Sequence, residues 1–164
     1  MNSINCLKKL GVKISFNKKN CYVYGKGLNG FEYKKNIVLN AGNSGTFARL
    51  ILGLLVKSPY YIKLVGDKSL SQRDFERVIS PLQKVGANFK VNIKKTLPLQ
   101  IIGSEYINPI HYIENRGSAQ CKSTIMLAAL NLPGKTVIKA KKSRDHTENI
   151  FKYLGIPIIV KKNK

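Results

Sequence analysis

Apolar residues recur along the chain with two different spacings, which predict an alternation of helices and strands. Apolar residues three and four positions apart, as at Phe47, Leu50, Ile51 and Leu54, are typical of a helix with one buried face. Short runs that alternate apolar and polar residues are typical of half-buried strands. The predicted helices are residues 1–10, 44–56, 74–85, 118–130 and 145–154, and the predicted strands are residues 12–16, 21–24, 37–39, 60–65, 88–93, 97–102, 136–140 and 156–160. This order is typical of an α/β fold.

Three similar helix ends divide the chain at regular intervals. Gly11, Gly86 and Gly155 each follow an apolar residue at a predicted helix end and precede a predicted strand. Glycine at such a position adopts the left-handed conformation that ends many helices. The spacing of about 70 residues predicts repeated βαβαββ units. Within the third predicted helix, Pro81 predicts a kink or a restart with Ser80 as the N-cap.

The chain is strongly basic: in 164 residues, 29 Lys and Arg against 8 Asp and Glu give a formal net charge of +21. Such a field attracts nucleic acids, acidic lipids and small anionic substrates. The positive residues are spread along the chain, with no arginine-rich arm and no interleaving of basic and aromatic residues. The longest apolar run, residues 50–56, is far shorter than the roughly 20 residues that span a bilayer. We therefore expect a cytoplasmic chain whose charge is mostly solvated surface and which binds neither nucleic acid nor membrane.

Candidate metal ligands are few. Cys6, Cys21 and Cys121 are too far apart in sequence for a metal-binding motif, and the only histidines are His111 and His146. Residues 25–30 match G-x-G-x-x-G, but no helix is predicted directly after them, so they indicate a turn rather than a dinucleotide site. We expect reduced thiols, no metal and no cofactor.

Four motifs at predicted helix starts combine small, hydroxyl, amide and guanidinium groups. They are residues 43–49, 66–73, 117–123 and 143–148. Helix N-termini attract anions, and guanidinium binds carboxylate and phosphate groups well. Each motif alone also fits an ordinary cap or a solvated loop, and Asp145 with Glu148 fits a capping box. Together the four motifs predict a shared site for a small anion.

The same four motifs carry a family resemblance. Residues 43–49 resemble N-A-G-T-x-x-R, residues 66–73 resemble G-D-x-S-L-x-x-R, residues 118–123 resemble S-A-Q-x-K-S, and residues 143–148 resemble S-R-D-H-T-E. These are motifs of the 5-enolpyruvylshikimate-3-phosphate synthase family, in its order and at its spacing, over essentially the whole chain. The resemblance implies an inside-out α/β barrel of βαβαββ units, with the helices inside. It also implies transfer of enolpyruvate from phosphoenolpyruvate to the 5-hydroxyl of shikimate 3-phosphate without a cofactor, a step in aromatic amino-acid biosynthesis.

The resemblance also implies which residues bind each substrate. Contacts to phosphoenolpyruvate are implied for Gly45, Arg73 and Gln120. Contacts to shikimate 3-phosphate are implied for Ser118, Ala119, Gln120 and Ser143, with Thr46 and Arg144 beside them. Full-length members of the family are expected to be monomeric.

Two departures from the family pattern affect the predicted activity. Asp74 stands where the family has a proline, and its carboxylate is expected to compete for Arg73. The family's K-S-x-S-x-x-R motif, and its second domain with the acid–base carboxylates, have no counterpart in the sequence. We therefore expect residues 1–164 to form a partial domain without catalytic residues, inactive by itself. The alternatives are a relative of UDP-N-acetylglucosamine enolpyruvyltransferase and a non-enzymatic basic module that binds nucleic acid.

Overall fold

The computed structural model describes residues 1–161, which form short sheets around a group of helices. The helices are α1 (Asn2–Lys9), α2 (Gly45–Leu54), α3 (Glu76–Val85), α4 (Ala119–Ala129) and α5 (His146–Tyr153), with a 3₁₀ turn η1 (Leu70–Gln72). The strands are β1 (Lys13–Phe16), β2 (Cys21–Tyr24), β3 (Val38–Asn40), β4 (Ile62–Val65), β5 (Asn88–Val91), β6 (Leu99–Ile102), β7 (His111–Glu114) and β8 (Val137–Ala140). Within this range no helix combines the length and the apolar character required to cross a bilayer. Residues 162–164 of the predicted domain lie outside the described range.

The middle of the chain forms one complete βαβαββ unit, which confirms the predicted repeat. Its elements follow in the order β3, α2, β4, α3, β5 and β6, and its sheet has the order β3-β4-β6-β5. The first two strands are parallel, whereas β6 is antiparallel to both of its neighbours. The elements α1, β1 and β2 match the end of such a unit, and β7, α4, β8 and α5 match the start of another.

The three predicted helix-ending glycines all have the left-handed conformation. The φ angles are 84° at Gly11, 124° at Gly86 and 69° at Gly155, a region that glycine occupies without steric cost. These glycines follow α1, α3 and α5, so each repeat turns from its second helix toward the next strand in the same way.

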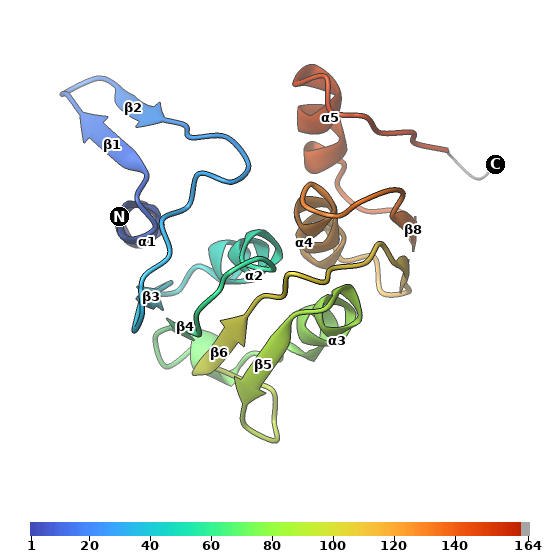
Figure 1. Cartoon of the computed structure of the whole chain (residues 1–164), viewed down its shortest axis with the longest axis horizontal. Helices are drawn as coiled ribbons and strands as arrows, with labels where there is room; N and C mark the ends of the chain where they lie inside the picture. Colours follow the sequence, from blue (N-terminus) through green and yellow to red (C-terminus); the bar gives the residue numbers. More distant parts are fainter. Residues whose placement is uncertain (162–164) are drawn as a thin grey trace.

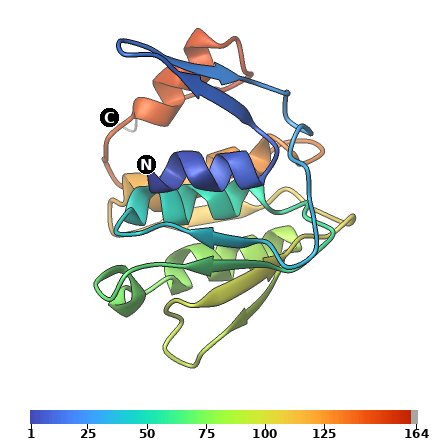
Figure 2. The same cartoon turned by 90° about the vertical axis from the view of Figure 1, so that its left-hand side faces the viewer.

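The helices α2, α3 and α4 lie against one another in the middle of the molecule, whereas α5 lies at its edge and is mostly exposed (Figures 1 and 2). At the closest contact between α2 and α4, a Cβ built on Gly53 would lie 2.2 Å from the carbonyl oxygen of Thr124. Only glycine allows the two backbones to approach this closely. Most residues of α4 from Cys121 to Ala128 are buried, because other elements surround this helix.

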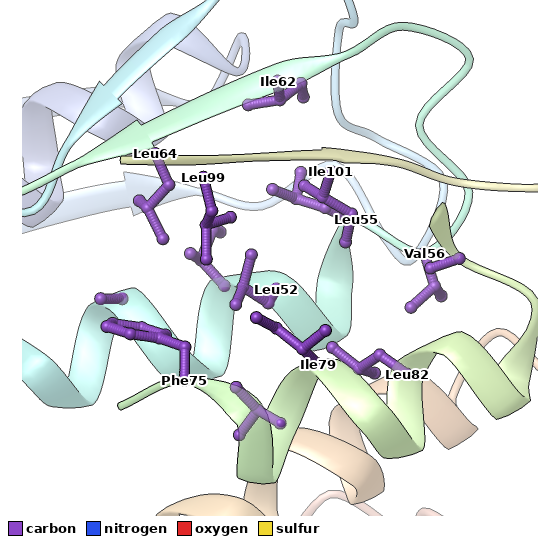
Figure 3. Close-up of a cluster of buried hydrophobic side chains, with 14 of the residues drawn as sticks. Leu52, Leu55, Val56, Ile62, Leu64, Phe75, Ile79, Leu82, Leu99 and Ile101 are labelled. Atoms are coloured by element: carbon purple, nitrogen blue, oxygen red, sulfur yellow. The ribbon is translucent and has the colours of Figure 1, made fainter. Parts of the chain in front are cut away.

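The largest part of the core lies between the sheet of the complete unit and its helices α2 and α3 (Figure 3). Apolar side chains from both helices and from the residues that flank them meet those of β4 and β6 there: Leu52, Leu55, Val56, Ile62, Leu64, Phe75, Ile79, Leu82, Leu99 and Ile101. Burial of each such side chain contributes about 1.5–3 kcal/mol. This core therefore holds the N-termini of the helices in fixed positions at one edge of the unit.

Two strand predictions differ from the structure. The strand β7 was not predicted, because Pro109 and the polar residues around it conceal a four-residue strand. The predicted strand 156–160 was wrong, since these residues form no ladder. A strand requires a hydrogen-bonded neighbour. The corresponding strand of the complete unit, β5, pairs only with β6, and the described residues contain no counterpart of β6 beside 156–160.

The restart of the helix predicted at Pro81, with Ser80 as its N-cap, was also wrong. The helix α3 continues through this residue, which is buried. A proline removes one helical hydrogen bond and crowds the preceding turn. Here the apolar burial of Pro81 with Val78 and Leu82 offsets that cost.

Candidate functional site

The turn before α2 places two predicted ligand-binding residues at a capped helix N-terminus. The Ser44 hydroxyl accepts a hydrogen bond of 3.2 Å from the N–H of Phe47, so Ser44 is the N-cap of α2. Gly45 and Thr46 follow as the first two helical residues. The amides of a first helical turn point outward along the axis and attract anions.

A second loop, residues 66–73, is tied to this turn by Asp67. Its carboxylate accepts hydrogen bonds from Asn43 Nδ2 at 2.6 Å and from the N–H of Leu70 at 2.8 Å. These two hydrogen bonds hold the pKa of Asp67 below its ordinary value, and the bond from the Leu70 N–H has the larger effect. The carboxylate therefore organises the two loops.

Gly45 lies against two guanidinium groups. A Cβ built at this position would lie 2.9 Å from Arg73 Nη1 and 3.3 Å from Arg49 Nη1. The backbone at the start of α2 and the two cations therefore face one small space. Arg73 itself is exposed, which leaves its guanidinium accessible to a ligand.

Arg49 is fixed from three sides. Its guanidinium donates to Gln120 Oε1 at 3.0 Å and to the carbonyl oxygen of Asp74 at 3.2 Å, and it lies 5.1 Å from the centre of the Phe75 ring. Burial lowers the pKa of Arg49, and the like charge of Arg73 lowers it further. Such a crowded cationic group favours an anion beside it.

The predicted competition of Asp74 for Arg73 was wrong. The Asp74 carboxylate accepts a hydrogen bond of 2.7 Å from the N–H of Glu76 at the start of α3. Among the described residues it forms no ion pair with Arg73. The acidic substitution in the family motif therefore serves as a local cap.

The start of α4 joins the same site. Gln120 Nε2 donates to Thr46 Oγ1 at 2.7 Å, so this amide contacts both Thr46 and Arg49. Ser118 caps α4 by accepting a hydrogen bond of 3.3 Å from the N–H of Cys121, and Ala119 is the first helical residue. The Ser118 N–H in turn donates to Glu114 Oε2 at 2.7 Å. The two helix starts therefore present Thr46, Ser118 and Gln120 as neighbours.

The sequence analysis did not single out Glu114, which holds this helix start in place. Its carboxylate is almost fully buried and pairs with Arg77 of α3. Burial by itself would raise the pKa of Glu114, but hydrogen bonds from the Ser118 N–H and from Arg77 bring it below its ordinary value. No sequence pattern indicated this role, because Arg77 and Glu114 come from separate repeats.

The fourth motif reaches the site through the loop before α5. Lys122 Nζ donates to the carbonyl oxygen of Arg144 at 3.1 Å and pairs with Glu148. A Cβ on Gly117 would lie 3.3 Å from the carbonyl oxygen of Lys142, so this loop runs beside the turn that precedes Ser118. The loop that carries Ser143 and Arg144 is therefore anchored next to the start of α4.

Among the residues predicted to bind substrate, Ser143 has a side chain whose hydrogen-bonding capacity is unused within residues 1–161. Its Oγ is buried and has no hydrogen-bond partner among residues 1–161. The guanidinium-bearing Arg144 beside it is exposed. The predicted capping box of Asp145 and Glu148 was wrong: Asp145 makes no side-chain cap, and Glu148 pairs with Lys122 instead.

All four predicted motifs therefore meet at neighbouring helix starts. Comparison with known proteins connects this arrangement to a family: a family model described as EPSP synthase (3-phosphoshikimate 1-carboxyvinyltransferase) matches residues 1–164. The chain belongs to the EPSP synthase family. This confirms the resemblance drawn from the motifs, and the enzymes of this family are transferases.

Individual relatives agree with this assignment. The 3-phosphoshikimate 1-carboxyvinyltransferase of Ruthia magnifica subsp. Calyptogena magnifica is 45% identical over 165 residues, covering 100% of this chain and 38% of the relative. That of Syntrophomonas wolfei subsp. wolfei is 40% identical, covering 98% of this chain and 37% of the relative. A solved structure of EPSP synthase from Acinetobacter baumannii superposes with a TM-score of 0.91 at 33% identity, covering 99% of this chain and 37% of that chain.

These comparisons confirm the predicted fold class. The chain has the α/β fold of an EPSP synthase domain, in incomplete form, and it spans under two-fifths of the length of these relatives.

Proposed function

We propose that this chain forms part of the substrate-binding site of a 3-phosphoshikimate 1-carboxyvinyltransferase. The activity is transfer of the enolpyruvyl group of phosphoenolpyruvate to the 5-hydroxyl of shikimate 3-phosphate, with release of phosphate, in the shikimate pathway. The observation that carries the proposal is the meeting of Gly45, Arg49, Arg73 and Gln120 at two helix starts in a chain of this family.

Phosphoenolpyruvate is assigned to the space between Gly45 and Arg73. The absence of a side chain at Gly45 lets an anion approach the first amides of α2. The exposed Arg73 guanidinium offers a planar pair of donors, which suits a carboxylate or a phosphate. Gln120, which contacts both Thr46 and Arg49, is assigned to a position between the two substrates.

Shikimate 3-phosphate is assigned to the loop before α5 and the start of α4. Ser143 supplies a buried hydroxyl whose hydrogen-bonding capacity is unused within residues 1–161. Ser118 and Ala119 supply the N-terminal end of α4. Thr46 and Arg144 complete the group as neighbouring donors. A doubly charged phosphate beside several donors forms short charge-assisted hydrogen bonds.

The reaction balances without a cofactor. In the addition step, the 5-hydroxyl loses its proton as its oxygen bonds to C2 of phosphoenolpyruvate, and C3 gains a proton as the C2–C3 double bond becomes single. In the elimination step, C3 loses a proton, the double bond forms again, and the bond from C2 to the phosphate oxygen breaks, so that phosphate leaves. In this scheme the chain binds and orients both anions. Two carboxylates beside the site are engaged already, Asp74 with the N–H of Glu76 and Glu148 with Lys122. We assign no proton-transfer residue to this chain, and we expect the 164-residue chain alone to bind substrate without turnover.

A cytoplasmic location is part of the proposal. Cys6, Cys21 and Cys121 are all unpaired thiols. Free thiols persist where glutathione and thioredoxin keep the environment reducing.

Thermal melting and calorimetric titration test the proposal directly. Shikimate 3-phosphate is expected to raise the melting temperature of the chain by more than shikimate or inorganic phosphate does at equal ionic strength. A ligand at 100 times its Kd stabilises the native state by about 2.7 kcal/mol. The Arg73→Ala variant should lose at least about tenfold in affinity for phosphoenolpyruvate, since a hydrogen bond to a charged group contributes about 1.5–3 kcal/mol.

The control variant is Lys57→Ala, which removes the same charge from an exposed position outside the four motifs. Its affinity should match that of the unaltered chain. Protection by UDP-N-acetylglucosamine in place of shikimate 3-phosphate would instead indicate the sister transferase. Tight DNA binding with a steep salt dependence, without any effect of shikimate 3-phosphate, would indicate a nucleic-acid module.

A further inference from the structure

A groove outside the four motifs lies between α3 and β7. One wall comes from α3 and the other from β7 and the residues that flank it, and the volume is about 440 Å³. The two elements run in opposite directions: the N–H of Asn108 donates to the carbonyl oxygen of Val85 at one end, and Arg77 pairs with Glu114 at the other. Sites for small molecules usually have volumes of about 300–1,000 Å³. The groove is therefore large enough for a small organic ligand.

A buried carboxylate organises two arginines at one end of this groove. Glu114 is 3% exposed, and its Oε1 both pairs with Arg77 and accepts a hydrogen bond of 3.3 Å from the N–H of Arg116. Its Oε2 accepts from the N–H of Ser118, so both oxygens are engaged. One carboxylate therefore fixes the guanidinium of Arg77 and the backbone of Arg116 at the same end of the groove, and Arg77 compensates its charge.

Both arginines retain donors for a ligand. A guanidinium has five N–H donors, and Arg77 forms one hydrogen bond, to Glu114, within residues 1–161. The Arg77 side chain is 32% exposed, so its remaining donors are partly shielded from water, where attraction to an anion is stronger. Arg116 is exposed, lines the same groove and forms no ion pair in the described part of the chain. Two guanidinium groups that line one groove can bind a phosphate through several charge-assisted hydrogen bonds.

The charged residues of the groove favour an anion. Three cationic and two anionic side chains line it, and they are Arg77, Lys84, Arg116, Glu76 and Glu114. Because Arg77 and Glu114 compensate each other, the remaining charges are Arg116 and Lys84 against the exposed Glu76. Lys84 is seven residues from Arg77 along α3, a rise of about 10 Å, so its charge acts on the far end of a ligand. The net charge of +21 on the chain adds a general attraction for anions.

An apolar surface lies beside the cationic groups. Ile113 lines the groove, yet its side chain is 62% exposed. The lining also includes Pro81 and Ile110, which are both buried. A ligand with an apolar body would remove the side chain of Ile113 from water, which is favourable. Inorganic phosphate would leave it exposed.

We propose that this groove binds a small organic phosphate, with its phosphate on Arg77 and Arg116 and its apolar body over Ile113. The site is distinct from the anion site assigned to Gly45 and Arg73, because none of its lining residues belongs to the four motifs. Phosphate is favoured over carboxylate because it offers three acceptor oxygens to the two guanidinium groups. The apolar body distinguishes the ligand from inorganic phosphate.

The test is a titration of the isotope-labelled chain with phenyl phosphate, followed by nuclear magnetic resonance. The amide signals of Ile113 and Arg116 should shift saturably, with one ligand per groove. Inorganic phosphate should bind at least about threefold more weakly, a ratio that corresponds to about 30 Å² of covered apolar surface. In the Arg73→Ala variant both amides should shift as in the unaltered chain, because Arg73 does not line the groove.

Two substitutions separate the phosphate contact from the apolar contact. Arg116→Gln should weaken the binding of both probes by about two- to fivefold, as expected for an exposed ion pair. Ile113→Thr keeps a β-branched residue in β7 and should weaken the binding of phenyl phosphate alone. Neither variant should change the melting temperature of the free chain.

Two further substitutions test the charge of the groove. Glu76→Gln removes the opposing charge and should tighten the binding of both probes. Lys57→Gln is the control, because it removes an exposed positive charge outside the groove and should leave both affinities unchanged.

Four results would overturn the proposal. Absence of saturable shifts at Ile113 and Arg116 would exclude the site, and equal effects of Arg116→Gln and Lys57→Gln would indicate attraction to the overall charge alone. Equal affinities for the two probes would contradict an organic ligand, and loss of the shifts in Arg73→Ala would assign the probe to the other anion site. None of these measurements uses shikimate 3-phosphate or phosphoenolpyruvate, so this groove and the proposed enzymatic function can fail independently.

Discussion

Gln120 and Thr46 are 74 residues apart in the chain, yet Gln120 Nε2 donates a hydrogen bond of 2.7 Å to Thr46 Oγ1. The other end of the same amide accepts from Arg49 Nη1 at 3.0 Å. One neutral side chain therefore connects the starts of α2 and α4 and orients a guanidinium between them. Its neutrality matters, because a negative charge at this point would oppose the anions assigned to the site.

The Gln120→Glu variant separates these two roles. The carboxylate would retain a hydrogen bond from Arg49, so the free energy of unfolding should fall by less than about 1 kcal/mol. Affinity for shikimate 3-phosphate should nevertheless drop at least about tenfold, because like charges near a protein surface repel by several kcal/mol at close range before screening by salt. Urea unfolding and calorimetric titration measure the two effects.

The control for this charge change is Gln83→Glu, on the exposed face of α3. It should leave both quantities unaltered. Equal loss of affinity in the two variants would show that Gln120 acts only through the overall charge of the chain.

Gly45→Ala should weaken anion binding without unfolding the protein. The new methyl group would lie 2.9 Å from Arg73 Nη1 and 3.3 Å from Arg49 Nη1, so it must displace the exposed end of Arg73 and shift the guanidinium of Arg49 slightly, but it meets no backbone atom. We expect a loss of about tenfold in affinity for phosphoenolpyruvate, the equivalent of 1.4 kcal/mol, with an unchanged melting temperature.

The double variant Gly45→Ala with Arg73→Ala tests the route of this effect. If the methyl group acts by displacing Arg73, adding it to Arg73→Ala should cost little more affinity. Full additivity of the two losses would contradict that explanation.

Gly53→Ala, unlike Gly45→Ala, should reduce the stability of the protein. A methyl group at this position would lie 2.2 Å from the carbonyl oxygen of Thr124, which is backbone and cannot move aside as a side chain can. The helices α2 and α4 would be forced apart, at a cost of about 1–3 kcal/mol or more. Because these helices also carry Thr46 and Gln120, substrate affinity should fall together with the urea midpoint.

Gly25→Ala is the matched control for Gly53→Ala. A Cβ on Gly25 has nothing within 4 Å, so the same methyl group should be tolerated there. Equal destabilisation by the two variants would indicate a general effect of replacing glycine.

Local signals explain how much of this fold and site was predictable from the sequence. The caps Ser44 and Ser118 bond to amides three residues away, so their roles follow from spacing alone. The Lys122–Glu148 pair joins α4 to α5 and replaced a capping box that local spacing favoured equally well. Contacts between repeats of this kind depend on how the helices pack, which no single segment encodes.

The missing ladder at residues 156–160 illustrates the same limit for strands. Its apolar residues follow Gly155 as those of β5 follow Gly86, so the local pattern was interpreted correctly as a repeat. Whether such a segment forms a strand depends on a neighbour at hydrogen-bonding distance. The pattern thus predicts the capacity for pairing, and the described residues supply no partner for it.

Glu114 should make the chain less stable in acid. Burial opposes its ionisation, but hydrogen bonds from the Ser118 N–H and from Arg77 outweigh burial and depress its pKa below the ordinary 4.5. A depressed folded-state pKa contributes stability that is present above the unfolded-state pKa and is lost as the pH falls through the folded-state pKa. The free energy of unfolding of the unaltered chain should therefore decline as the pH falls from about 5 toward 3.

Glu114→Gln removes this titration, so the free energy of unfolding of the variant should depend less steeply on pH over the same range. At pH 7 this free energy should be lower than that of the unaltered chain, because Arg77 loses its buried partner. Urea unfolding at pH 7, 5, 4 and 3 gives the comparison. The control is Glu105→Gln at an exposed carboxylate that forms no ion pair within residues 1–161. If Glu114→Gln and the unaltered chain gave parallel curves, acid sensitivity would have to come from other carboxylates. A loss of slope in Glu114→Gln alone would show that this one buried carboxylate accounts for the acid sensitivity of the chain.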